Sequence, residues 1–304
     1  MNPGLNRAEI KPLIIKKTAN IVKTLLKIFA ALILAAASAL PAFGQARKSN
    51  KAAQVRDISQ ADAARRWSEF LESRPSGDYV FKFELEHMPR QSESAMYEGE
   101  IFGKYFSAQN FLMRVEIRPA QSPEKTKKYL LKKIGGKIGV WEESAGKIKK
   151  LDDPRDWLRP MLEGLIYTPF DVLMPFKSWP CKYAGAGRAM RAVHFFDLCA
   201  PDGFPKGEAD LSRVRVALSR EFNAPFQTEY FDAKGEVSKA VNLSSVKKID
   251  GNWIVKKIET LDKKSRDKDK ITILRAGFFD ALDPKIFDES ALAEPAKIPE
   301  LKEL

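Results

Sequence analysis

Histidine and cysteine are scarce in this chain, with two of each among 304 residues. His87 and His194 stand alone, and neither has a partner at a spacing typical of metal ligands. The sequence also lacks a Gly-x-Ser-x-Gly elbow, a P-loop and a His-Glu-x-x-His helix. Ser-x-x-Lys occurs five times, a frequency that a lysine-rich chain produces by chance. We therefore expect a protein that is not an enzyme and that uses no metal and no cofactor.

A long apolar run is missing as well, because the run from Ile28 to Leu40 has only 13 residues and contains Ser38. A membrane-spanning helix needs about 20 apolar residues. Basic residues precede the run and small residues follow it, which is the order of a secretory signal peptide. We expect residues 1–46 to be a signal peptide, cleaved near Ala46, and the mature protein to be periplasmic. The alternative is an uncleaved inner-membrane anchor. No cysteine near Ala46 could carry a lipoprotein's acyl anchor.

The leader also holds part of the positive charge. It has six Lys or Arg and one acid, so the mature chain keeps a net charge of +7 out of +12. Its basic residues stand in short clusters beside acids, for example at 147–153 and 262–269, which is typical of solvated turns. We expect no nucleic-acid partner, although such a surface could rest against anionic lipid headgroups.

The mature chain begins with a flexible lead-in at 47–58 and ends with a loose C-terminal tail at 293–304. Between them Ser59 begins a helix that Pro75 and Gly77 end. From residue 79 onward the period changes to two, as in Phe81, Phe83 and Leu85, and short turns separate the strands. Gly99 and Gly103 in one strand suggest a bulge or a bend. This pattern predicts an antiparallel, meander-like sheet.

Residues 153–174 interrupt the strands with two predicted helices, one starting at Asp153-Pro154 and one at Thr168-Pro169. Their apolar side chains must cover something, and the apolar face of the sheet is available. One interpretation is a closed core. The other is a lid over a cavity that stays open for an apolar ligand, lined by the following side chains: Phe81, Phe83, Phe111, Met113, Trp157, Met161 and Leu165.

Cys181 and Cys199 flank a predicted hairpin and are symmetric about its tip near residue 190. An exported chain meets an oxidising compartment. We therefore predict a disulfide between them, worth about 3 kcal/mol if it is unstrained. The alternative is two buried free thiols.

Several local motifs resemble the periplasmic outer-membrane lipoprotein-sorting family, which has the LolA/LolB-like fold. They are Gly-Lys-Ile-Gly-Val-Trp at 136–141, Thr-Pro-Phe-Asp-Val-Leu-Met-Pro-Phe at 168–176, Glu-Tyr-Phe-Asp-Ala-Lys-Gly at 229–235 and Lys-Ile-Asp-Gly-Asn-Trp at 248–253. The order of elements is similar too, and the resemblance covers residues 59–292.

The resemblance implies an α+β fold: a strongly curved antiparallel sheet of eleven strands, an incomplete barrel, with helices covering the concave apolar face. It implies a monomeric carrier whose cavity receives acyl chains of a lipoprotein or a related lipid. It leaves open whether an inner-membrane ABC transporter delivers the cargo and whether an outer-membrane acceptor takes it. In the family an arginine on an inner strand holds the lid closed, and Arg114 lies at about the matching place. The alternative for Arg114 is a solvated side chain beside Glu116.

Two classes of function remain. The first is a carrier that moves a lipid or lipoprotein toward the outer membrane. The second is a non-catalytic periplasmic binding or envelope-assembly factor with the same fold that transfers no lipid. A membrane-tethered version with an uncleaved leader is a third.

Overall fold

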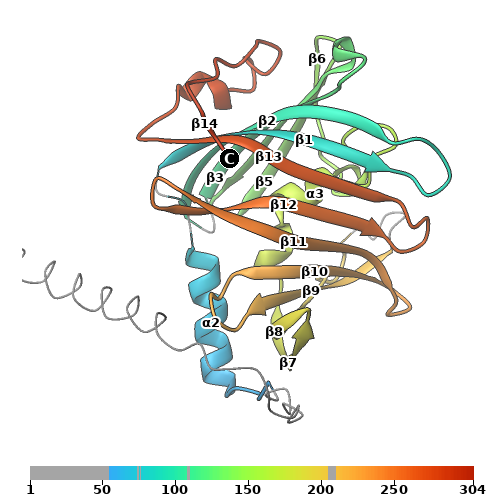
Figure 1. Ribbon diagram of the computed structural model, residues 1–304, viewed down its shortest axis with the longest axis vertical. Coiled ribbons are helices and arrows are strands. Elements are labelled where there is room, and N and C mark those ends of the chain that lie inside the picture. The colour runs from blue at the N-terminus through green and yellow to red at the C-terminus, as the bar shows by residue number, and fades with distance from the viewer. Residues whose placement is uncertain (1–54, 74, 76, 108–109, 205–209) are drawn as a thin grey trace, which may run out of the picture. The chain divides into compact units, whose positions relative to one another are not determined.

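A single antiparallel sheet of 14 strands dominates the structure (Figure 1). The computed structural model describes residues 55–73, 75, 77–107, 110–204 and 210–304. The strands are β1 (Asp78–Met88), β2 (Ala95–Ser107), β3 (Asn110–Pro119), β4 (Lys127–Ile134), β5 (Lys137–Ser144), β6 (Lys147–Lys150), β7 (Cys181–Ala189), β8 (Arg191–Cys199), β9 (Leu211–Ser219), β10 (Pro225–Asp232), β11 (Val237–Ile249), β12 (Asn252–Asp262), β13 (Lys268–Phe279) and β14 (Lys302–Glu303).

Two meanders make up this sheet. Strands β1 to β6 follow one another in space, and so do β7 to β13; pairing of β1 with β13 joins the two sets. The sheet is not closed, since β6 and β7 are its two edges, and β14 adds to β13. This confirms the predicted antiparallel sheet and is consistent with the predicted curvature. The expected number of eleven strands is wrong, because the described residues form fourteen.

Alternation along the strands gives the sheet two apolar faces. Phe83 and Leu85 on β1 point into one cluster of buried side chains, the main core, whereas Val80 points into another on the opposite face, the second core. The main core is the larger and includes side chains from both meanders. The second core contains Val80, Phe102, Leu130, Leu282, Ile286, Phe287, Leu292 and Leu301.

The N-terminal helix α2 (Gln60–Glu72) packs on the main-core side. Ser59 is its N-cap, and the Ser59 hydroxyl accepts a hydrogen bond from the Asp62 amide at 3.1 Å, as the sequence predicts. Ala63, Trp67 and Phe70 form its buried stripe. The Trp67 ring stacks on Phe196 of β8 with 5.3 Å between centroids, so that the helix is fixed to the second meander.

The two glycines of β2 serve a different purpose from the one predicted. The register between β1 and β2 is regular, so there is no bulge between them. Instead, a Cβ atom at Gly99 would collide with the Phe83 ring, and one at Gly103 would collide with the Tyr79 ring. These glycines therefore make room for aromatic side chains of the neighbouring strand.

The C-terminal residues form an ordered cover on the second face, so the expectation of a loose tail at 293–304 is wrong. The short helix η4 (Pro284–Phe287) contributes Ile286 and Phe287 to the second core, and Leu301 is buried there as well. Strand β14 then pairs with β13. Pro295 and Pro299 suggested a tail, but backbone hydrogen bonds and single apolar anchors hold this segment in place.

Both cysteines are free thiols in the structure, so the predicted disulfide is absent. They do flank the β7–β8 hairpin as expected. However, Cys181 pairs with Leu198, one position away from Cys199. Since neighbouring strand residues point to opposite faces of a sheet, the register directs the two sulfur atoms apart.

The predicted signal peptide at 1–46 and most of the lead-in at 47–58 lie outside the described residues. Within the described ranges no helix is long and apolar enough to cross a membrane. Asp57, at the end of the lead-in, accepts a hydrogen bond from the Ala186 amide at 2.6 Å, which ties it to β7.

Candidate functional site

Residues 151–179, the bridging segment, connect the two edge strands β6 and β7 and so pass from one edge of the sheet to the other. Only three short pieces of it are helical: η2 (Asp156–Leu158), α3 (Pro169–Leu173) and η3 (Pro175–Ser178). The segment is therefore held by what it contacts more than by its own hydrogen bonds.

The second of the two helices predicted here is present, but the first is reduced to one turn. Thr168 and Asp171 form a capping box that starts α3. Pro160 explains the loss of the other helix, because a proline disfavours the helical conformation for the residue before it. Arg159 accordingly has extended backbone angles, φ −80° and ψ 148°, and η2 ends there.

The apolar side chains of the bridging segment point into the main core. Met161 is only 1% exposed and Phe170 is fully buried. All seven side chains predicted to line a cavity belong to this core or pack against it, which brings both meanders and the bridging segment together. Buried are Phe83, Phe111, Trp157, Met161 and Leu165, and partly buried are Phe81 and Met113.

A buried carboxylate on β13 anchors the middle of the bridging segment. Asp269 has no exposed surface, and its Oδ2 accepts hydrogen bonds from the amides of Ile166 at 2.7 Å and Tyr167 at 2.9 Å. Its Oδ1 lies 2.7 Å from Nδ1 of His87 on β1. Burial raises the pKa of Asp269, while the hydrogen bonds from His87 and the two amides act in the opposite direction.

Two further ties hold the segment on either side. Upstream, the Tyr129 hydroxyl on β4 donates to the Met161 carbonyl at 2.7 Å. Downstream, the Lys239 ammonium on β11 contacts both carboxylate oxygens of Asp171, at 2.7 and 2.8 Å. Lys239 also lies 4.4 Å from the centre of the Tyr230 ring. Strands of both meanders thus hold the same short segment.

Cavities lie on both sides of Pro160 in the bridging segment. One of about 330 Å³ is bordered by Leu165 and Tyr230 and opens toward the charged turn between β12 and β13. Another of about 240 Å³ is bordered by Tyr129 and Leu151. The first is at the small end of the range for ligand pockets, about 300–1,000 Å³.

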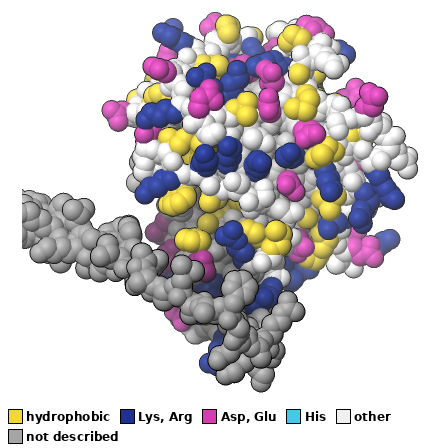
Figure 2. Space-filling model, viewed as in Figure 1, with side chains coloured by type: hydrophobic (Ala, Val, Ile, Leu, Met, Phe, Trp, Pro, Cys, Tyr) yellow, Lys and Arg dark blue, Asp and Glu magenta, His cyan; other side chains and the backbone are white. Residues whose placement is uncertain are grey.

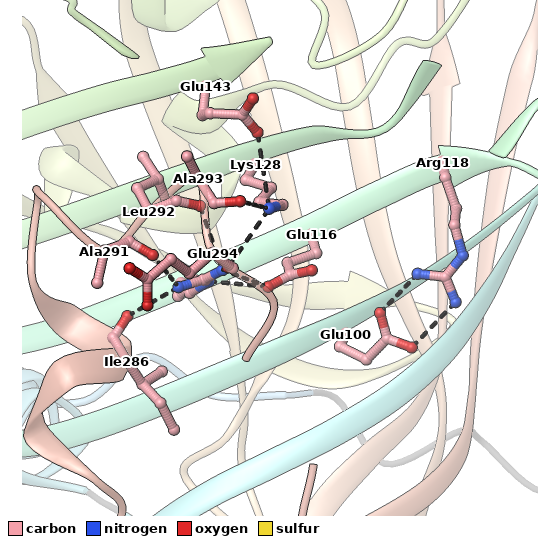
Figure 3. A network of polar contacts seen from close by, with 11 residues as sticks. Glu100, Glu116, Arg118, Lys128, Glu143, Ile286, Ala291, Leu292, Ala293 and Glu294 are labelled. Atoms are coloured by element: carbon pink, nitrogen blue, oxygen red, sulfur yellow. Dashed lines mark hydrogen bonds and ion pairs between the residues drawn. The ribbon is translucent and has the colours of Figure 1, made fainter. Parts of the chain in front are cut away.

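Arg114 does not contact the bridging segment. Its guanidinium lies on the second face, is 1% exposed and donates to four carbonyls of the C-terminal cover, those of Ile286, Ala291, Leu292 and Glu294 (Figure 3). It also pairs with Glu116 at 2.7 Å. The predicted role in holding a lid over the main core is therefore replaced by one in holding the C-terminal residues. The alternative interpretation named the correct partner, Glu116, but the Arg114 side chain is buried and is not solvated.

A third cavity, of about 330 Å³, lies beside Arg114 beneath the C-terminal cover. Its border includes Phe279, Leu282 and Pro295. The four carbonyls and Glu116 already use the donors of Arg114, so the charged side chains left at the border of this cavity are those of residues such as Asp283, Lys285 and Lys297.

No sequence pattern identified Asp269, His87 and Lys239 as residues that hold the bridging segment. The alternation along β1 and β13 does indicate that His87 and Asp269 point inward. His87 continues the inward series of Phe83 and Leu85, and Asp269 precedes Ile271 and Ile273 on the inward face of β13. A charged residue at an inward position of a strand has to find a partner. The described residues contain no group of three or more His, Cys, Asp or Glu that could hold a metal ion.

Solved structures with the same arrangement decide the fold. An outer membrane lipoprotein-sorting protein domain from Vibrio parahaemolyticus has a TM-score of 0.63 at 14% identity, over 76% of this chain and 97% of that one. The chain has a LolA-like fold. A LolA superfamily protein from Nitrosomonas europaea agrees, with a TM-score of 0.58 at 14% identity over 77% of this chain and 100% of that one.

A DUF1329 family protein from Desulfovibrio piger shares the LolA-like fold at a TM-score of 0.63 and 16% identity, over 76% of this chain and 96% of its own. A family model described as an uncharacterized protein matches residues 200–294. No curated protein matches the sequence. At these identities the likeness establishes the fold and leaves the activity to be argued from the site.

Proposed function

We propose that this protein is a periplasmic carrier that binds the acyl chains of a lipoprotein or a related lipid and moves them toward the outer membrane. The binding space lies between the bridging segment and the concave face of the sheet. One observation carries the proposal: the bridging segment connects two unpaired sheet edges and contributes mainly apolar side chains to the main core. The proposed contacts are Phe81, Phe83, Phe111, Met113, Trp157, Met161 and Leu165.

The physical basis is the transfer of acyl chains out of water. Each buried CH₂ group contributes about 0.8 kcal/mol, so a few carbons already give useful affinity. Aromatic and methionine side chains suit this task, because Met161 and Met113 can adapt their shape to a flexible chain. Delivery by an inner-membrane ABC transporter and receipt by an outer-membrane acceptor fit such a carrier.

Loading requires the bridging segment to move away from the sheet. The polar ties at Tyr129, Asp269 and Lys239 define where it stays attached and where it can open. The cavities on both sides of Pro160 mark the places where packing between the segment and the strands is already incomplete. An acyl chain would enter there and displace side chains of the main core.

One observation favours a second candidate, a periplasmic binding or assembly factor without lipid transfer. The protein's own side chains occupy the main core, where Met161, Phe170 and Phe196 are each at most 1% exposed. If the main core never opens, the protein must bind its partners through its outer surface.

Mass spectrometry of protein purified from the periplasm separates the two candidates. The carrier should contain a bound acyl lipid, and a Met161→Asp variant should lose it because a carboxylate in the binding space is costly to bury. Ile286→Asp is the matched control, since it places the same charge in the second core. Lipid-free wild-type protein, or equal lipid loss in both folded variants, would favour the assembly factor.

A further inference from the structure

Exposed hydrophobic side chains gather at one end of the sheet. In an antiparallel meander the turns alternate between two ends, so the turns after β2, β4, β7, β9 and β11 share one end. Helix α2 lies there too, since the Asn223 amide donates to the Arg66 carbonyl at 2.7 Å and the Tyr105 hydroxyl donates to the Leu71 carbonyl at 3.3 Å. We call this the α2 end; in Figure 1 the β11–β12 turn marks it on the left, and the β10–β11 and β12–β13 turns lie on the right.

Each of the five turns at the α2 end has a large exposed hydrophobic side chain in it or within two residues of it. The described residues include nine such side chains, and only Met96 and Ile148 lie equally close to turns at the opposite end. Single exposed hydrophobic residues are normal on a protein surface, but one at every turn of one end indicates a contact surface. The five are Phe106, Ile134, Met190, Phe222 and Trp253.

Trp253 is the largest of them and is 70% exposed. On the outward face of the β11–β12 hairpin it pairs with Lys248, and Val246, which is 57% exposed, pairs with Val255. The Lys248 ammonium lies 5.9 Å from the Trp253 ring. A tryptophan beside a lysine on an apolar strip is the composition found where proteins meet lipid headgroups.

Met190 forms the tip of the β7–β8 hairpin and is 89% exposed. Its φ is +63°, a conformation that glycine or asparagine adopts at lower cost. Met190 thus places a flexible apolar side chain at a position whose backbone conformation favours glycine or asparagine. A residue retained at such a cost is consistent with a function in binding a partner and not in stabilising the fold.

The turns at the α2 end are more basic than acidic. Within these turns and the four adjoining described residues of each strand, six Lys or Arg are exposed, compared with two acids, whereas helix α2 at the same end exposes Arg65 together with Asp62, Glu69 and Glu72. One of the two acids in the turns, Asp250, is paired with Lys302 at 2.5 Å. On the face seen in Figure 2, hydrophobic, basic and acidic side chains are interspersed. The six basic residues are Lys137, Arg188, Arg191, Arg220, Lys247 and Lys248.

We propose that the α2 end docks on the surface of a bilayer that contains anionic phospholipids. The five hydrophobic side chains enter the headgroup region and the lysines and arginines contact lipid phosphates. A fluid bilayer can receive apolar side chains that stand on separate turns, whereas a protein partner requires a continuous complementary surface. The proposal does not depend on lipid carriage, since it concerns the outer surface.

Cosedimentation of the purified protein with vesicles tests the docking. Binding should be strong to vesicles of phosphatidylglycerol and phosphatidylcholine in equal parts, and weak to phosphatidylcholine alone. Because a basic residue near such a surface contributes about 1 kcal/mol, Lys247→Gln with Lys248→Gln should lower the affinity roughly tenfold or more. Trp253→Ser should lower it severalfold. Met96→Ser, at the opposite end, is the matched control and should leave it unchanged.

Tryptophan fluorescence gives a second measurement. The emission should shift to the blue on addition of the mixed vesicles, and Trp253→Phe should remove most of that shift while the protein still binds. Lack of binding, equal binding to both vesicle types, or an equal effect of Met96→Ser would overturn the proposal. Lack of binding would also leave an acidic protein as the partner of the α2 end.

Discussion

The Nδ1 atom of His87 lies 2.7 Å from Oδ1 of Asp269, and the other oxygen of this carboxylate accepts two amide hydrogen bonds from the bridging segment. A single buried side chain thus connects β1, β13 and the segment proposed to open. The contact joins the two meanders at the place where the bridging segment crosses them, so we expect it to control how easily the segment leaves the sheet.

Replacing this carboxylate should loosen the bridging segment. In Asp269→Asn one oxygen becomes an amide nitrogen that cannot accept a hydrogen bond. We expect the free energy of unfolding to fall by about 1–3 kcal/mol and the amides of Ile166 and Tyr167 to exchange hydrogen faster. Denaturant unfolding and hydrogen exchange measure both effects. Asp267→Asn is the control, since Asp267 accepts from the Arg90 amide instead; equal exchange in both variants would argue against the anchor.

The contribution of Lys177 in η3 to the stability of the protein should rise with pH above about 8, whereas the raised pKa values of Cys181 and of buried tyrosines such as Tyr129 act in the opposite direction above about 9. Burial, together with the nearby charge of Lys133, lowers the pKa of Lys177 from 10.5 to about 8. Between these values the unfolded chain binds a proton that the folded chain does not, so this contribution to the free energy of unfolding increases with pH. A shift of this size corresponds to about 3 kcal/mol.

Urea unfolding at several pH values checks the Lys177 prediction. The increase should disappear in Lys177→Met and persist in Lys234→Met, because Lys234 lies in the exposed β10–β11 turn. If Lys177→Met shows the same increase as the wild type, the ammonium of Lys177 is not the group responsible.

Arg114→Met should detach the C-terminal cover without affecting the bridging segment. The variant loses the hydrogen bonds to four carbonyls and leaves Glu116 without its ion pair. We expect a loss of about 3–5 kcal/mol of stability and faster proteolysis after residue 280, with lipid retention unchanged in the folded protein. Arg65→Met, which removes solvent-exposed pairs with Asp62 and Glu69, should cost much less. Selective lipid loss in Arg114→Met would restore a role for Arg114 in the main core.

Thiol titration checks the corrected assignment of the cysteines. The structure places Cys181 opposite Leu198 and leaves both thiols free. Protein purified without reductant should therefore give two thiols per chain under denaturing conditions. A count of zero would show that the bridge forms after all and that the β7–β8 register differs.

Much of the fold could be predicted from local patterns. Alternation located most strands, and Ser59 and Thr168 marked true helix starts. The errors arose where the conformation or the hydrogen bonds of the backbone determine the structure, and not the spacing of apolar side chains. Pro160 shortened a helix whose apolar spacing looked correct, and the C-terminal residues are held by carbonyl groups that bind Arg114.

The candidate site could be predicted only on its apolar side. The seven proposed lining residues meet in one core because their period fixes the face on which they lie. The ties through Asp269 and Lys239 join elements about 70 to 180 residues apart in sequence. A local sequence pattern cannot identify a partner so far away in the sequence. A charged residue on the inward face of a strand indicates only that a partner exists.

Photo-crosslinking with a lipid that carries a reactive group on its acyl chain tests the central claim most directly. The account predicts crosslinks to side chains of the main core, above all Phe83, Phe111, Met161 and Leu165, and none to Leu130 or Ile286 of the second core. Crosslinks confined to the second core or to the outer surface, or none at all with folded protein, would contradict it.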